Sequence, residues 1–143
     1  MVKFQGGVKE AAKMLAGLSA SAREKVLELI SKKDPRMAEV LHKNMYTFED
    51  LKYLTQMMLI ELLREIKVAD MGLALRISSN DLKDFVLQNS PRGMRQEMEE
   101  ILMGPLQLAS KVEEAQERIM IVVRKKIDKG QLIINKDSSE KYV

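Results

Sequence analysis

Signals that start and end helices recur at short intervals along almost the whole of this sequence. Asp34-Pro35 places a capping carboxylate directly before a proline at the first position of a helix. Hydroxyl residues precede apolar residues at helical spacing in several other places. These candidate caps are Ser21, Thr55, Ser79, Ser90 and Ser110. The spacing predicts about eight or nine short helices joined by tight connections.

Residue composition favours the same fold class. Ala, Leu, Met, Lys and Glu, which are strong helix formers, dominate the sequence. Charged residues make up 31% of the chain and hydrophobic residues 45%, which is typical of a globular protein rather than a disordered one. A chain of 143 residues is also long enough to bury a core. We therefore expect an all-α protein.

The longest predicted helix covers roughly residues 111–129. Its acidic residues lie near the start and its basic residues near the end, an order that complements the helix dipole. Gly130 follows as a suitable C-cap. Residues 131–135 are expected to pair as a short strand or simply to pack, and residues 136–143 to form a frayed tail.

The first 44 residues contain successive short helices with the size of one helical-repeat unit. Such a unit cannot bury its own apolar face fully and normally stacks on a neighbour. We therefore expect an exposed apolar groove on this unit. The residues predicted to line the stacking surface are Val8, Ala11, Leu15, Val26 and Leu29.

Residue types that carry catalysis are sparse. His42 is the only histidine, there is no cysteine, and the GGVKE stretch lacks the spacing of a phosphate-binding loop. The carboxylates of Glu99-Glu100 and Glu113-Glu114 are adjacent in sequence, so on a helix they point about 100° apart and do not converge. Eleven methionines favour gap-filling in a helical core, with an adaptable binding groove as the alternative. We expect no enzymatic activity, no cofactor and no metal site.

Charge and hydropathy limit the classes of partner. The net charge is only +3, and basic and acidic residues are interleaved rather than segregated, which argues against nucleic-acid binding. No apolar run approaches the roughly 20 residues that span a bilayer, so we expect no direct membrane insertion. The absence of cysteine is compatible with a reducing cytoplasm.

Residues 90–105, SPRGMRQEMEEILMGP, predict a helix with a methionine face and a charged face. At 100° per residue, Met94 and Met98 lie on one side, opposite Arg92, Gln96, Glu99 and Glu100. Basic residues come before acidic ones, which opposes the helix dipole at a cost of a few tenths to about 1 kcal/mol. Such a face is either an ordinary solvated surface or a recognition ridge.

Several short motifs follow one another in a characteristic order. They are GGVKEAAKMLAGL, DPRMAEVLHKNMYTFEDL, LLREI, LALR, LKDFVLQNS and VEEAQERIM. In order and spacing they resemble the later part of the flagellar motor switch family FliG, over nearly the whole chain. The resemblance implies an all-helical, non-catalytic rotor and switch protein of bacterial motility and chemotaxis. It implies a place in the C-ring, the cytoplasmic ring of the flagellar motor, at the cytoplasmic face of the basal body.

The resemblance also implies a division of the chain. Residues 1–44 correspond to an armadillo-like helical-repeat unit, residues 45–48 to a hinge, and residues 49–143 to a small C-terminal bundle with one long final helix. The hinge residues are Met45, Tyr46, Thr47 and Phe48, with tyrosine where the family pattern has phenylalanine. We expect non-helical backbone at 45–48 and burial of at least two of its three large apolar side chains.

The functional residues of the family carry over to four charged positions. They are Arg76, Arg92, Glu99 and Glu100, which we expect to face solvent and to meet opposite charges on the cytoplasmic loop of the stator protein. The implied partners are this stator loop, a FliM-type switch protein and neighbouring copies of the same chain in a ring. At Gln107 the family pattern has an arginine.

Two alternative functions remain open from the sequence. One is a paralogue on the same scaffold, an adaptor that binds ring neighbours and contributes little torque. The other is the related cytoplasmic domain of a magnesium transporter, which predicts acidic clusters that converge on a cation.

Overall fold

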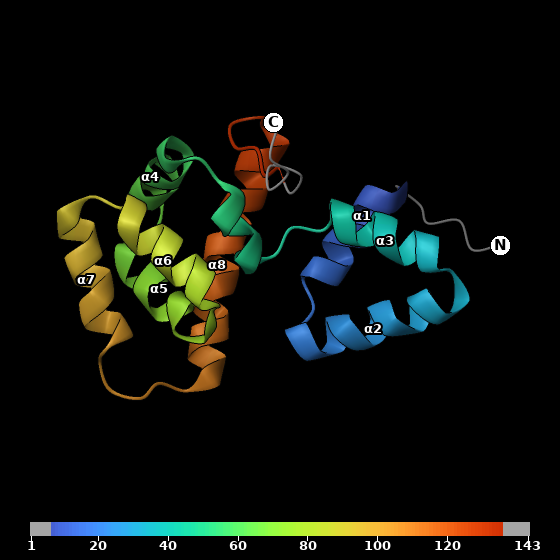
Figure 1. Cartoon of the computed structure of the whole chain (residues 1–143), viewed down its shortest axis with the longest axis horizontal. Coiled ribbons are helices and arrows are strands. Elements are labelled where there is room, and N and C mark those ends of the chain that lie inside the picture. The colour runs from blue at the N-terminus through green and yellow to red at the C-terminus, as the bar shows by residue number, and fades with distance from the viewer. Residues whose placement is uncertain (1–6, 136–143) are drawn as a thin grey trace, which may run out of the picture. The chain divides into compact units, whose positions relative to one another are not determined.

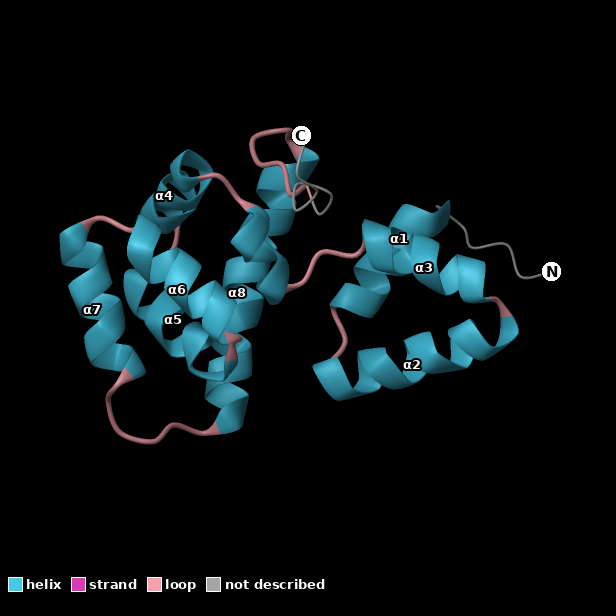
Figure 2. Ribbon diagram, viewed as in Figure 1, coloured by secondary structure: helices cyan, strands magenta, loops and turns pink. Residues whose placement is uncertain are grey.

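The computed structural model describes residues 7–135, and these form helices and connections without any strand (Figures 1 and 2). Within this range there are eight α-helices and two short 3-10 helices. The prediction of an all-α fold is therefore confirmed. The predicted tail at 136–143 lies outside the described residues.

The chain divides into two compact units, with the boundary between Thr47 and Phe48. The first unit contains three helices, α1 (Gly7–Ala16), α2 (Ala20–Lys33) and α3 (Pro35–Asn44). Half of the buried residues in its core are alanines of α1, and larger side chains from α1, α3 and the following connection fill the rest. The buried residues are Ala11, Ala12, Leu15, Ala16, Leu41 and Met45.

The five residues of the predicted stacking surface do not share one exposed face. Ala11 and Leu15 are buried inside the unit, and Val8 and Val26 pack partly against the same cluster. Only Leu29 is exposed, with 62% of its surface accessible. The prediction that all five residues line one exposed groove is wrong, because the three helices of the unit themselves bury most of the apolar side chains of α1.

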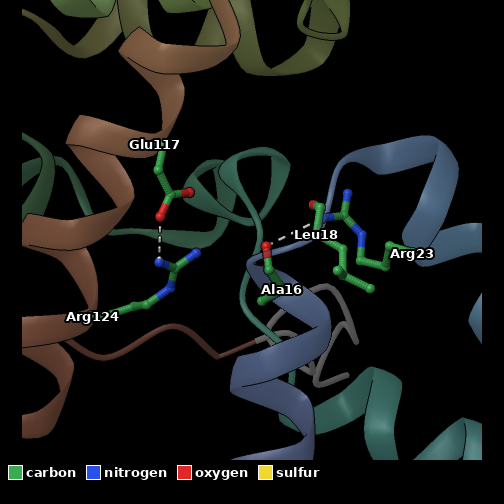
Figure 3. A network of polar contacts seen from close by, with 5 residues as sticks. All are labelled: Ala16, Leu18, Arg23, Glu117 and Arg124. Carbon is green, nitrogen blue, oxygen red and sulfur yellow. Dashed lines mark hydrogen bonds and ion pairs between the residues drawn. The ribbon is translucent and has the colours of Figure 1, made fainter.

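Helix ends in the first unit are satisfied by side chains. The Asp34 carboxylate accepts from the Met37 amide at 3.1 Å, and α3 begins at Pro35, as predicted. The cap of α2 is Ser19, whose Oγ accepts from the Ala22 amide at 3.3 Å, rather than the predicted Ser21. The Arg23 guanidinium donates to the carbonyl oxygens of Ala16 and Leu18 at the end of α1 (Figure 3).

The connection between the units consists of Met45, Tyr46 and Thr47, which have no regular structure. Phe48 begins the 3-10 helix η1 (Phe48–Tyr53), so the prediction of non-helical backbone was right for three residues and wrong for the fourth. Met45 and Phe48 are buried, at 2% and 6% exposure, and Tyr46 is half-buried. Burial of two of the three large side chains is therefore as expected, and Met45 belongs to the core of the first unit.

The second unit packs its helices around a core of leucine, methionine and β-branched residues. After η1 it contains α4 (Gln56–Glu65), α5 (Val68–Ala74), η2 (Leu75–Ile77), α6 (Asn80–Asn89), α7 (Arg92–Leu102) and α8 (Ala109–Asp128). The short helix α5 is central to this unit. Its contacts with α7 and with α8 are the two most extensive contacts between elements of the unit. Fully buried side chains include Leu51, Leu59, Leu62, Leu63, Met71, Leu75, Leu82 and Ile119.

The caps in this unit follow the sequence only in part. Thr55 caps α4 and Ser79 caps α6, both through their hydroxyl oxygens, as predicted. The long helix α8 begins directly after Leu108 without a side-chain cap, so the predicted cap at Ser110 is wrong. Gly130 follows its end with φ +70°, the left-handed conformation that favours glycine. Beyond it, residues 131–135 form no strand but pack through Leu132 and Ile134.

Candidate functional site: a charged helix and its supports

Helix α7 has one face in the core and one in solvent. Met98 is fully buried, and Met94, Ile101 and Leu102 are half-buried beside it. The opposite side chains are exposed, and they are Arg92, Gln96, Glu99 and Glu100. The arrangement matches the helical wheel drawn from the sequence. The ridge is basic at its N-terminal end and acidic at its C-terminal end, and it projects into solvent.

The start of α7 differs from the prediction. Ser90 is buried and its Oγ donates to the carbonyl oxygen of Val86, so this hydroxyl completes the end of α6 instead of capping α7. The residue before α7 is Pro91, which offers no side-chain hydrogen bond. Arg92 then occupies the first helical position. The N-terminus of α7 therefore carries a cation where the helix dipole prefers an anion.

Close approach of α5 and α7 depends on Gly72. A Cβ atom at this position would lie 3.1 Å from the Cα and the carbonyl oxygen of Met98, and 3.1 Å from the Cβ of Ile101. Two of these three atoms belong to the backbone of α7 and cannot rotate away. Glycine thus sets the distance at which α7 rests on α5, and with it the height of the charged ridge above the core.

Arg76 does not face solvent with the other three charges, and that part of the prediction is wrong. It lies on η2, is half-buried, and points to the C-terminal end of α7. Its Nη1 donates to the carbonyl oxygen of Ile101 at 2.9 Å and its Nη2 to that of Gly104 at 3.2 Å. The carbonyl groups at the end of a helix lack partners within the helix and carry partial negative charge. A nearby cation is therefore stabilised when it points toward them.

An ion pair joins α5 to α8. The Asp70 carboxylate accepts two hydrogen bonds from Arg118 of α8, at 3.0 and 3.2 Å. This hydrogen bonding raises the pKa of the Arg118 guanidinium, and partial desolvation opposes the rise. Helix α5 begins at Val68 with Lys67 as its cap residue, so Asp70 lies in its first turn. Sequence spacing gave no sign of this pair, because its members lie 48 residues apart.

Two further ion pairs involve residues of α8. The Lys126 side chain is 8% exposed, and its ammonium lies 3.0 Å from the Glu65 carboxylate at the end of α4. Within α8, Arg124 donates to Glu117 at 2.9 Å, two turns earlier (Figure 3).

A shallow depression of about 460 Å³ lies between α8 and the α4–α5 connection. It is lined by Glu65, Ile66, Lys67, Asp70, Arg118, Ile119 and Val122.

The connection after α7 exposes several apolar side chains. Met103, Leu106 and Leu108 have 85%, 96% and 67% of their surface accessible. Gln107, which stands where the family pattern has arginine, is exposed in the same segment. No role was predicted for these three large apolar residues, although the sequence places them around a Gly-Pro pair.

The four predicted contact residues thus fall into two groups. Arg92, Glu99 and Glu100 share the exposed face of α7, and Arg76 supports that helix from behind. Between residues 7 and 135, no three histidine or acidic side chains are grouped so that they could hold a metal ion. No helix within the same range is long and apolar enough to span a membrane.

Comparison with known proteins identifies relatives of this chain. The family model for the FliG C-terminal domain matches residues 28–134. The flagellar motor switch protein FliG of Bacillus subtilis is 30% identical over 142 residues, covering 96% of this chain and 41% of that protein. FliG of Aquifex aeolicus is 32% identical over 130 residues, covering 90% and 39%. The chain thus spans about two-fifths of the length of the curated relatives it matches.

Solved structures agree with the sequence comparisons. A crystal structure of FliG from H. pylori superimposes with a TM-score of 0.64 at 28% identity, covering 92% of this chain and 62% of that one. Full-length FliG from Aquifex aeolicus gives a TM-score of 0.56 at 30% identity, covering 93% and 41%. These likenesses extend over both units described above. The chain belongs to the FliG C-terminal domain family.

Proposed function

We propose that this protein is a rotor and switch component of the bacterial flagellar motor, which contacts the stator through the exposed face of α7. The observation that carries the proposal is the position of Arg92, Glu99 and Glu100 on that face, opposite the buried Met98. The chain belongs to the FliG C-terminal domain family, and the resemblance to FliG implies a contact with a charged loop of the stator, which this ridge would provide. The role is mechanical and requires no catalysis.

Exposed charges suit a contact that forms and breaks repeatedly. A surface ion pair contributes only ~0–1 kcal/mol, because both partners remain well hydrated. Complementary charges chiefly govern the rate and orientation of encounter rather than the lifetime of the complex. The separated basic and acidic ends of α7 give the ridge a direction, so a partner with the opposite order of charges docks in one orientation only.

The remaining parts of the proposal concern the ring. Residues 45–48 act as a hinge through which a FliM-type switch protein reorients the second unit. The first unit is an armadillo-like repeat that stacks on a neighbouring copy, with Leu29 and the still more exposed Met14 available on its surface. The assembly lies at the cytoplasmic face of the flagellar basal body. Support comes from family membership and from the position of the unit boundary between Thr47 and Phe48.

Charge reversal on the ridge tests this function. In a strain whose swimming depends on this protein, we expect Arg92→Glu combined with Glu99→Arg to reduce motility strongly. Stability should not fall and should rise by a few tenths to about 1 kcal/mol, because the exchange places an anion at the start of α7 and a cation near its end, as the helix dipole prefers. Reversing the opposing charges on the stator loop should restore part of the swimming speed.

A matched control uses two exposed charges away from α7. Glu61→Arg on α4 combined with Lys125→Glu on α8 makes the same exchange of signs and should leave motility unchanged. If the ridge variant accumulates, joins the motor and swims like the parent protein, the exposed charges of α7 are only a solvated surface. That result would favour an adaptor of the ring that contributes little torque.

A further inference from the structure

The C-terminal end of α7 carries the wrong charges for a helix end. Glu99 and Glu100 lie near the negative end of the helix dipole, and the last turn contains no basic residue of its own. The final carbonyl groups also need partners from outside the regular helical ladder. The amides of Met103 and Gly104 still donate to Glu99 and Ile101, at 3.0 and 3.2 Å. After them Pro105 has no amide proton to continue the pattern.

Arg76 supplies the missing cation and the missing donors together. Its two terminal nitrogens bond the carbonyl oxygens of Ile101 and Gly104, one in the last turn of α7 and one just beyond it. The planar guanidinium holds its nitrogens in a fixed fork, so the two bonds fix the orientation of the segment between these carbonyls as well as its distance. This segment immediately follows the acidic pair.

The element that carries Arg76 is itself firmly held. Leu75 is fully buried, and the Ser78 Oγ donates back to the Leu75 carbonyl oxygen at 2.8 Å. The Glu49 carboxylate then accepts from both the amide and the hydroxyl of Ser79, at 2.8 and 2.6 Å. Arg76 therefore projects from a short turn that is fixed on both sides, so its guanidinium has a defined position before it meets α7.

We propose that Arg76 is a positioning residue, which fixes the C-terminal turn of α7 and thereby the placement of the Glu99 and Glu100 carboxylates. It acts through the helix backbone and does not meet the partner protein itself. The importance of this placement for the motor rests on the proposed function. The positioning role is a property of the free chain and is measured without any partner, so the two can fail separately.

Amide hydrogen exchange, followed by NMR on the free 143-residue chain, tests the proposal. In Arg76→Met, which keeps the apolar stem but removes the fork, we expect the Met103 and Gly104 amides to exchange about three- to tenfold faster than in the parent. Amides in the middle of α4 should change much less, since the loss is local. Arg64→Met removes an equally positive but exposed side chain from α4 and should leave exchange at Met103 and Gly104 unaltered.

A conservative variant keeps the test decisive if the methionine variant folds poorly. Arg76→Lys retains the charge but lacks the planar fork, so its acceleration at these two amides should lie between those of the parent and the methionine variant. Unchanged exchange at Met103 and Gly104 in both Arg76 variants would overturn the positioning role. Equal acceleration throughout the second unit would overturn it as well, because Arg76 would then contribute only to general stability.

Discussion

Single residues decide where the charged ridge of α7 stands. Gly72 lets the helix approach α5, Met98 anchors its buried face, and Arg76 holds its end. None of these three residues is part of the exposed face. The charges at Arg92, Glu99 and Glu100 can vary with little effect on stability, whereas their supports are embedded in the packing of the unit.

Substitution of Gly72 tests this support directly. Alanine is favoured over glycine in a helix by about 1 kcal/mol, but overpacking a tight contact typically costs about 1–3 kcal/mol. Because the added Cβ would meet backbone atoms of α7 at 3.1 Å, the steric cost should prevail. We expect Gly72→Ala to lower the free energy of unfolding of the second unit by up to about 2 kcal/mol, the steric cost less the gain in helix propensity. Urea titration followed by NMR signals of α5 and α8 measures this change.

Gly93 provides the matched control. A Cβ at this position on α7 would meet no atom within 4 Å, so only the helix propensity changes. Gly93→Ala should raise the free energy of unfolding by up to about 1 kcal/mol. If both variants shift stability in the same direction and by the same amount, close packing at Gly72 does not determine the position of α7.

At the scale of elements, local signals predicted some helix starts and missed others. Asp34, Thr55 and Ser79 cap the helices that follow them, as expected. Ser90 does not, because its hydroxyl is buried and bonds the end of the preceding helix. Ser110 lies inside α8, which begins at the exposed, extended connection after Leu108. Cap spacing alone cannot distinguish these cases, since the outcome depends on where the backbone turns into the helix and on which other groups lie near the side chain.

The same limit explains what the sequence predicted about the site. Helical periodicity placed Arg92, Glu99 and Glu100 on one exposed face because that face depends only on the angle per residue. The direction of Arg76 depends on a contact with residues 101 and 104, and the pairs Asp70–Arg118 and Glu65–Lys126 join separate helices. Long-range contacts of this kind leave no periodic pattern in a single sequence.

The whole chain consists of two units joined by Met45, Tyr46 and Thr47. Met45 packs into the core of the first unit, and Phe48 is buried at the start of the second. A short connection with anchored ends can support two alternative packings of its middle residues, which is the kind of bistable element that a switch requires. Tyr46 lies between these two residues in the sequence and is half-buried.

Single-molecule energy transfer tests the hinge. The 143 residues contain no cysteine, so Lys25→Cys on α2 and Lys125→Cys on α8 give one labelling site in each unit. We expect at least two distance populations, and addition of a FliM-type protein should change their ratio. Two labels within the second unit, at positions 61 and 125, serve as the control and should give one population. A single narrow distance between the units, with and without the partner, would contradict a switching hinge.

The most direct test of the central claim is crosslinking between the ridge and the stator in living cells. Single cysteines at Arg92, Gln96 or Glu99 are paired with single cysteines along the cytoplasmic loop of the stator, and Lys125→Cys on α8 is the control. If α7 is the contact helix, oxidation should produce crosslinks from the three α7 positions and none from Lys125→Cys, and the yield should fall when the charges are reversed. Equal yields from α7 and α8, or none from α7 in motors that rotate, would contradict the account.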